Sequence, residues 1–132
     1  MEVFFEVKVL QSHPILLNGG IVLLELSCPF MREVEPGQFV LIEPLNVGSV
    51  MPRPFSIYYF GNGKLTIVFR KAGANTELYS KLRPGNKIKI SGPYGKPFKT
   101  EKAAKYILVG GGIGIAGLHF FGKQLSKKGT KI

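Results

Sequence analysis

Short segments in which apolar residues alternate with polar ones, or form compact β-branched and aromatic runs, follow one another through residue 92. Such segments are typical of half-buried or fully buried strands. They predict six strands, over residues 3–10, 21–26, 38–42, 55–60, 64–70 and 87–91. The turn signals between them are Pro36-Gly37, Gly61-Asn62-Gly63 and Pro84-Gly85, and the second predicts a hairpin. This spacing predicts a small antiparallel barrel or sandwich.

One helical segment interrupts the predicted strands. Thr76 is a suitable N-cap for a helix that runs to about residue 82, and Pro84-Gly85 ends it. After residue 99 the pattern changes. The apolar residues 106–109 predict a buried strand, residues 110–117 a glycine turn, and the apolar residues from 118 onward a helix, with residues 130–132 as the start of a further strand.

A strand, a glycine turn and a helix start are how a dinucleotide phosphate site begins. Only fifteen residues follow Gly117, whereas one nucleotide-binding βαβ unit needs about 30. We therefore expect residues 1–100 to form a β domain and residues 101–132 to form only the first strand, turn and helix of a truncated α/β domain.

The composition of the chain excludes several kinds of functional site. Cys28 is the single cysteine, so the chain supplies neither an internal disulfide nor the cysteines of an iron–sulfur cluster. The chain has no aspartate, which leaves no Ser–His–Asp set, and no metal-ligand spacing occurs. His13 and His119 are isolated, and we expect packing or surface roles for both.

Charge is unevenly distributed along the chain, whose net charge is +10. Residues 1–52 carry two basic and six acidic side chains, whereas residues 53–132 carry sixteen basic and two acidic ones. The basic part suits an anionic cofactor, an acidic protein, nucleic acid or simply solvent. Glu2 and Glu6 interrupt the first apolar stretch, and the glycine-rich run 106–121 is a poor membrane span. We expect a cytoplasmic protein without a membrane segment.

Two segments combine cations with groups that suit a phosphate-bearing ligand. Arg53-Pro54-Phe55-Ser56-Ile57 offers a forked cation, a flat apolar ring and a small hydroxyl. Arg70-Lys71-Ala72-Gly73-Ala74-Asn75-Thr76 places two cations before a flexible turn and a helix N-terminus, where backbone N–H groups favour anions. The alternatives are an exposed arginine beside a core phenylalanine, and an ordinary capped helix.

Two further candidate segments contain several glycines each. Ser91-Gly92-Pro93-Tyr94-Gly95-Lys96-Pro97-Phe98 predicts a rigid loop or a simple connector between domains. Gly112-x-Gly114-x-x-Gly117 fits a dinucleotide fingerprint, with close helix–strand packing as the alternative. The acidic residue that hydrogen-bonds the ribose in NADH-binding sites is expected about 20 residues further on, past residue 132. These 132 residues therefore do not distinguish NADH from NADPH as the cofactor.

The order of these motifs resembles the ferredoxin–NADP reductase superfamily. Arg53-Pro54-Phe55-Ser56 resembles its flavin motif, Gly73-Ala74-Asn75-Thr76 its pyrophosphate motif, and residues 110–114 the start of its nicotinamide domain. Within it, the chain is most similar to electron-transfer subunits of dihydroorotate dehydrogenase and gamma subunits of cytoplasmic hydrogenases. The resemblance implies FAD on a six-stranded antiparallel Greek-key barrel, followed by the truncated α/β domain.

The resemblance also implies roles for individual residues. Ser56 would lie near the flavin nitrogen that accepts hydride, as the residue closest to catalysis, and Arg53 would hold the pyrophosphate. The other implied flavin contacts are Pro54, Phe55, Ile57, Phe69, Arg70, Gly73, Asn75 and Thr76. The implied nicotinamide turn is Gly110, Gly111, Gly112 and Gly114. No metal site is implied.

The implied function is that of an FAD-binding oxidoreductase subunit that passes electrons between NAD(P)H and a partner redox protein. The implied partner is either a dihydroorotate dehydrogenase-like subunit of pyrimidine biosynthesis or a hydrogenase-like subunit. The chain supplies only part of an NAD(P)H site, and its oligomeric state stays open. Two alternatives remain: a redox-inactive flavin barrel that serves assembly, and a basic β-barrel in which Tyr58, Tyr59, Phe60 and Phe69 stack on nucleic-acid bases. The resemblance implies that the chain has no nucleic-acid partner. The chain departs from the pattern at Gly117, where relatives usually carry proline.

Overall fold

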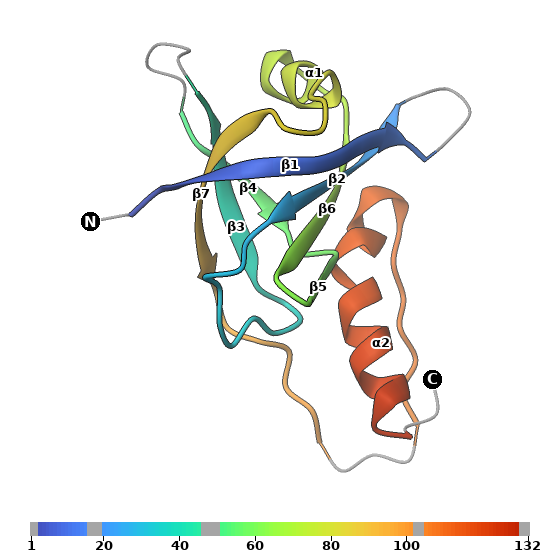
Figure 1. Cartoon of the computed structure of the whole chain (residues 1–132). Helices are drawn as coiled ribbons and strands as arrows, with labels where there is room; N and C mark the ends of the chain where they lie inside the picture. Colours follow the sequence, from blue (N-terminus) through green and yellow to red (C-terminus); the bar gives the residue numbers. More distant parts are fainter. Residues whose placement is uncertain (1–2, 16–19, 46–50, 102–104, 130–132) are drawn as a thin grey trace.

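The main feature of the fold is one antiparallel sheet of seven strands, in the order β4-β3-β7-β1-β2-β6-β5 (Figure 1). The computed structural model describes residues 3–15, 20–45, 51–101 and 105–129. The strands are β1 (Phe5–Pro14), β2 (Ile21–Ser27), β3 (Phe39–Pro44), β4 (Arg53–Ser56), β5 (Tyr59–Gly61), β6 (Lys64–Arg70) and β7 (Lys87–Tyr94). The helical elements are α1 (Ala74–Ser80), the 3-10 helix η1 (Gly112–Gly117) and α2 (His119–Lys127). The predicted mainly β class is confirmed.

The single strand predicted over residues 55–60 is divided in two, which is why the sheet has seven strands rather than six. β4 pairs with β3, and β5 pairs with β6 at the opposite end of the sheet order. Between them the Ile57 N–H donates to the Gln38 carbonyl at 3.2 Å, and the Tyr58 N–H donates to the Thr66 carbonyl at 2.9 Å. This one segment therefore pairs with the β3 side at one end of the sheet order and with β6 at the other, and it closes the sheet into a barrel.

The connections of the barrel are of the Greek-key type. The β2–β3 and β6–β7 connections join strands that are not neighbours in the sheet. The predicted β5–β6 hairpin is confirmed, with Gly61 opposite Lys64. Asn62 and Gly63 both have positive φ, at 52° and 72°, as a two-residue type I′ turn requires.

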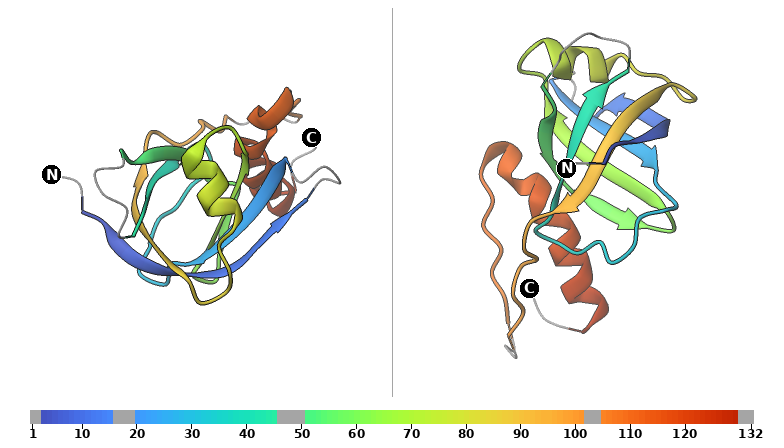
Figure 2. Two further views of the ribbon diagram at one scale, coloured as in Figure 1. Left: turned by 90° about the horizontal axis from the view of Figure 1, so that it is seen from above. Right: turned by 90° about the vertical axis from the view of Figure 1, so that its left-hand side faces the viewer.

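α1 closes one end of the barrel. Seen from above, it lies across the opening surrounded by the strands (Figure 2). Its Tyr79 is fully buried, and the inward-facing core includes Leu24, Ile42, Ile67 and Ile90. The predicted start of this helix was wrong: Gly73 is the N-cap, and Thr76 is the third helical residue.

The strand predicted over residues 106–109 is not formed. Ile107 and Val109 are 82% and 85% exposed, and no strand of the described chain pairs with this segment. An apolar run becomes a buried strand only when neighbouring strands accept its hydrogen bonds and cover its side chains. The helix predicted after it is confirmed as α2, which lies beside the barrel (Figure 1). The strand predicted from residue 130 lies outside the described residues.

Candidate functional site

β4 is mostly exposed, and its side chains turn inward only at Phe55 and, just beyond the strand, at Ile57. Arg53, Pro54 and Ser56 are exposed, Phe55 is half-buried, and Ile57 beyond the strand is fully buried. The ring of Phe55 lies 5.7 Å from that of Phe69 and 5.9 Å from that of Tyr79, centroid to centroid. Phe55 and Phe69 thus belong to an aromatic cluster beneath α1, the arrangement foreseen in the core-phenylalanine alternative. Their contact with a flavin stays a prediction.

Arg53 presents an uncompensated positive charge near α1. Within the described part of the chain the ion pairs are Lys87 with Glu6 at 3.3 Å and Lys89 with Glu43 at 3.8 Å, so Arg53 has none. Burial raises the pKa of Tyr79 to about 12; Glu43 adds to this effect and Arg53 opposes it. The Arg53 guanidinium is therefore close enough to act on the α1 phenol and remains able to bind an anion.

The start of α1 is organised by the Thr76 hydroxyl. Its oxygen accepts hydrogen bonds from the N–H groups of Ala72 at 2.8 Å and Gly73 at 3.1 Å. The first backbone bond of the helix runs from the Glu77 N–H to the Gly73 carbonyl at 2.9 Å. The N–H groups of a first helical turn precede that ladder, and such groups are the donors that an anion can use at a helix start. A Cβ built on Gly73 would meet nothing within 4 Å, so the space beside it is open.

η1 brings the glycine segment against two predicted flavin residues from different strands. A Cβ built on Gly117 would lie 3.7 Å from both Cβ and Oγ of Ser56 in β4. A Cβ built on Gly112 would lie 3.7 Å from Nη2 of Arg70, at the end of β6. The structure therefore brings together the β4 motif, the end of β6 and the glycine turn.

The individual glycines of this segment have different structural roles. A Cβ on Gly110 would approach Cα of Ile115 and Cδ1 of Leu118 to 3.0 Å, so close backbone packing requires glycine there. Gly111 and Gly114 have open space around them, and the Gly114 N–H donates to the Gly111 carbonyl at 3.1 Å. Gly110 is therefore closely packed against Ile115 and Leu118, whereas Gly111 and Gly114 leave room for a ligand.

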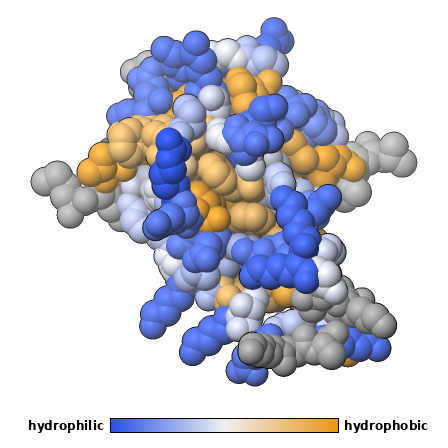
Figure 3. All heavy atoms as spheres, turned by 60° about the horizontal axis from the view of Figure 1, so that its bottom comes forward, coloured by the Kyte–Doolittle hydropathy of each residue, from blue (hydrophilic) through white to orange (hydrophobic). Residues whose placement is uncertain are grey.

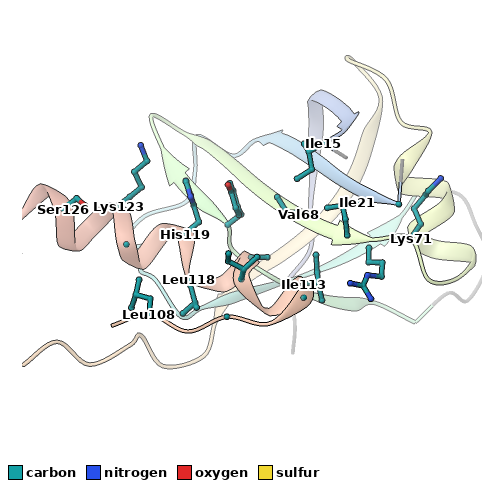
Figure 4. A pocket seen from close by; sticks show the side chains of 18 residues that line it. Ile15, Ile21, Val68, Lys71, Leu108, Ile113, Leu118, His119, Lys123 and Ser126 are labelled. Carbon is teal, nitrogen blue, oxygen red and sulfur yellow. The ribbon is translucent and has the colours of Figure 1, made fainter. Parts of the chain in front are cut away.

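A groove of about 1070 Å³ runs between the outer face of β2 and β6 and the segment formed by η1 and α2 (Figure 4). Ile21 and Val68 line it from the barrel, and Ile113 lines it from η1. Lys71 and Lys123 lie toward its opposite ends (Figure 4). Its apolar walls and cationic ends suit an elongated ligand that has flat apolar parts and anionic groups.

The groove includes only part of the predicted site. Arg70, Gly110 and Gly112 line it, whereas Arg53, Ser56 and the start of α1 do not. The predicted residues therefore form two adjoining regions that meet where η1 contacts Ser56 and Arg70.

One pair in this region was missed by the sequence analysis. The rings of Tyr58 and His119 stack with centroids 4.1 Å apart and an angle of 4° between their planes. Both residues line the groove and also a smaller hollow of about 340 Å³. Burial lowers the pKa of His119, and Lys123 lowers it further. No local pattern signals such a pair, because the partners belong to segments far apart in the chain.

The other described side chains supply neither a reactive thiol nor a metal-binding group. Cys28 is fully buried, and burial raises the pKa of its thiol to about 12, which makes it a poor nucleophile. Among the described residues, no group of three or more His, Cys, Asp or Glu side chains is placed to hold a metal ion. None of the described helices is long and apolar enough to cross a membrane.

The connector after β7 and the end of α2 carry exposed lysines. They are Lys96, Lys99, Lys105, Lys127 and Lys128. Hydrophilic residues cover much of the face seen in Figure 3, with apolar residues visible between them. This surface retains the anion-attracting character expected from the charge distribution.

Known proteins resemble the chain in sequence and in fold. It is 37% identical over 83% of its length to the dihydroorotate dehydrogenase B (NAD(+)) electron transfer subunit of Clostridium acetobutylicum, and 33% identical over 96% to that of Listeria welshimeri. It covers 44% and 51% of those proteins, so it spans about half the length of the curated relatives it matches. Among models of known protein families, none matches.

A solved structure shares the fold. A structure of an NADH-dependent reduced ferredoxin-NADP oxidoreductase matches 94% of this chain with a TM-score of 0.84 at 26% identity, and the match covers 45% of that protein. Together with the curated relatives, this match confirms the resemblance that the order of motifs predicted.

Proposed function

We propose, from the premise that this chain is a homologue of dihydroorotate dehydrogenase B electron transfer subunits with the fold of ferredoxin–NADP reductase-like flavoproteins, that it binds FAD and carries electrons between NAD(P)H and a partner redox protein. The observation that carries the proposal is the contact of the glycine segment with the flavin motif, at Ser56–Gly117 and Arg70–Gly112. In this proposal the contacts would bring the start of the nicotinamide site next to the flavin site.

The described residues fit FAD. Arg53 is an exposed cation without an acidic partner, and the open space at Gly73 adjoins the first-turn donors of α1. These groups would bind the pyrophosphate, with Thr76 holding the turn in shape through the hydrogen bonds to its hydroxyl. Arg70 would contact the ribitol or ring. When bound, FAD supplies the redox chemistry, by accepting a hydride and passing electrons on.

The protein would contribute position and electrostatics to this chemistry. Ser56 would place a hydroxyl at the flavin nitrogen, and residues 110–114 would form the start of the nicotinamide site. Pro54, Phe55, Ile57, Phe69 and Asn75 would shape the flavin site from β4, β6 and α1. In this proposal residues 1–100 form the FAD-binding barrel, and residues 101–132 form the first part of an NAD(P)-binding domain.

The partner would be a dihydroorotate dehydrogenase-like catalytic subunit of pyrimidine biosynthesis, since the relatives are named electron transfer subunits of that enzyme. The lysines of the connector and of α2 favour an acidic docking surface on it. A cytoplasmic location remains part of the proposal. A hydrogenase-like partner is the second candidate, and nothing in the fold distinguishes the two.

Stacking of nucleic-acid bases is a poorer explanation of the aromatic residues. Phe69 is only 3% exposed and packs on Tyr79. Tyr58 stacks on His119, and Tyr59 meets Phe120 edge to face. These rings are occupied by contacts within the protein, which disfavours the base-binding alternative.

The test is to purify the chain, denature it and identify any released flavin. FAD in the supernatant, or uptake of added FAD by a colourless preparation, is the expected result. Anaerobic addition of NADH and of NADPH then tests the redox-inactive alternative: bleaching of the bound flavin supports an oxidoreductase and argues against an assembly module. A protein that neither carries nor takes up FAD overturns the proposal.

A further inference from the structure

An aromatic cluster joins α2 to the segment between β4 and β5. His119 stacks face to face on Tyr58 and meets Tyr59 at 74°, with centroids 6.3 Å apart. Phe120 meets Tyr59 at 72° and 5.6 Å. We call Tyr58, Tyr59, His119 and Phe120 the aromatic latch. It attaches the first residues of α2 to the barrel.

The latch lies next to the contact between the flavin motif and the glycine segment. Ser56 precedes Tyr58 by two residues, and Gly117 precedes His119 by two residues. A Cβ built on Gly117 would lie 3.7 Å from Ser56, so both segments run together from that contact to the stacked rings. The stacked rings and the Ser56–Gly117 contact therefore lie two residues apart on both segments.

The barrel half of the latch is held by its backbone. The Tyr58 N–H donates to the Thr66 carbonyl at 2.9 Å, and the preceding Ile57 is fully buried. His119 stands at the first position of α2, directly after η1. We propose that His119 is a positioning residue which, by stacking on Tyr58, holds residues 110–117 against Ser56 and Arg70 and thereby sets how closely the glycine segment approaches the proposed flavin site. The inference rests on the proposed function.

The surroundings of His119 favour its neutral form. Burial and the ammonium group of Lys123 on α2 both lower the pKa of His119. The barrel contributes Tyr58 and Tyr59, and Glu25 and His13 line the same smaller hollow. Because the stacked state disfavours the imidazolium, the latch is intact above the ordinary histidine pKa of about 6.5 and weakens as pH falls below it.

The direct test is titration of the full chain with FAD at about pH 7.5 and about pH 5.5, one unit on either side of that ordinary value. His119→Ala removes the stack and should weaken FAD binding about five- to tenfold at the higher pH. His119→Phe keeps an aromatic face but no titrating group. It should bind FAD as the unmodified chain does at the higher pH.

The pH dependence separates positioning from packing alone. The unmodified chain should lose FAD affinity several-fold at the lower pH, whereas His119→Phe should not. His13→Phe, which changes the only other histidine, should keep the pH dependence of the unmodified chain. The inference is overturned if His119→Ala binds FAD normally, or if His119→Phe keeps the pH-dependent loss.

A second readout does not depend on flavin. Amide hydrogen exchange across residues 110–121 should be faster in His119→Ala than in the unmodified chain and unchanged in His119→Phe. If the unmodified chain binds no FAD, the proposed function fails, and the exchange rates alone decide whether His119 positions the glycine segment. Unchanged exchange in His119→Ala contradicts the inference.

Discussion

The hydroxyl of Thr76 accepts a hydrogen bond of 3.1 Å from the backbone N–H of Gly73 and donates one of 3.1 Å to the Gly73 carbonyl. This pair closes the start of α1, which in turn closes the barrel. The threonine therefore stabilises the turn, while the glycine leaves space beside it. We thus assign stability to Thr76 and ligand binding to Gly73, and substitutions at the two positions can test the two roles separately.

Thr76→Val should destabilise the fold. The change keeps the shape of the side chain but removes the oxygen that accepts from Ala72 and Gly73. We expect the free energy of unfolding to fall by about 1 kcal/mol, the usual contribution of a cap. Urea denaturation measures it. Thr76→Ser, which keeps the oxygen, should unfold close to the unmodified chain, and equal loss in both variants would contradict the role of the hydroxyl.

Gly73→Ala should leave the fold intact and weaken FAD binding. The backbone of Gly73 is extended, at φ 177°, and a Cβ there meets nothing within 4 Å. Alanine therefore costs no strain and lowers the entropy of the unfolded chain. A bound pyrophosphate would occupy that space, so we expect affinity for FAD to fall about tenfold, as for loss of a hydrogen bond to a charged group. Unchanged affinity measured by calorimetric titration would place the pyrophosphate elsewhere.

Local sequence signals predicted those parts of the fold that depend on neighbours along the chain. Asn62 and Gly63 suit the two positive-φ positions of a hairpin turn, and the hairpin forms there. The division of residues 55–60 had no such signal, because it depends on two distant strands pairing with one segment. The buried strand over 106–109 failed for a related reason: an apolar run does not show whether neighbouring strands are present to cover Ile107 and Val109.

The candidate site likewise combines residues that local sequence signals indicated with contacts that depend on the tertiary fold. Arg53 and Gly73 were found because their types and spacing carry their chemistry, and they lie where an anion has access. The inward packing of Phe55 and the stacking of His119 on Tyr58 depend on tertiary contacts. Period and composition do not encode such contacts, so the sequence offered the packing of Phe55 only as one of two alternatives and gave no signal for the stacked pair.

Stability should fall at alkaline pH because two buried acids hold their protons more strongly when folded. Burial raises the pKa of Cys28 from 9.0 to about 12, and that of Tyr79 from 10.0 to about 12. Above pH 9 the unfolded chain loses protons that the folded chain retains, so the stabilising contribution of these groups is present at neutral pH and lost between about pH 9 and 12. Unfolding by urea across this range measures the slope.

Cys28→Ala provides the control for the alkaline effect. It removes the titrating thiol, so the fall in stability between pH 9 and 10 should become shallower, whatever the stability of the variant at neutral pH. The remaining fall above pH 10 would come from groups that include Tyr79. The same slope in both proteins would contradict the buried-thiol explanation.

Gly110→Ala and Gly111→Ala should differ although the residues are adjacent. A Cβ at Gly110 would meet Ile115 and Leu118 at 3.0 Å, whereas one at Gly111 meets nothing within 4 Å. We expect Gly110→Ala to lower the unfolding free energy by about 1–3 kcal/mol, as overpacking does, and Gly111→Ala to have little effect. Thermal unfolding of the pair measures the difference. Equal stability would show that the glycine segment is looser than its contacts imply.

The account depends most on Arg53 as the anchor of a flavin pyrophosphate. The most direct measurement is the equilibrium affinity for FAD of the unmodified chain, Arg53→Ala and Arg83→Ala, the last removing an exposed arginine three residues after the end of α1. The account predicts one FAD bound per chain, affinity at least about tenfold lower for Arg53→Ala, and no change for Arg83→Ala. Absence of FAD binding by the unmodified chain, or equal affinity in all three proteins, would contradict it.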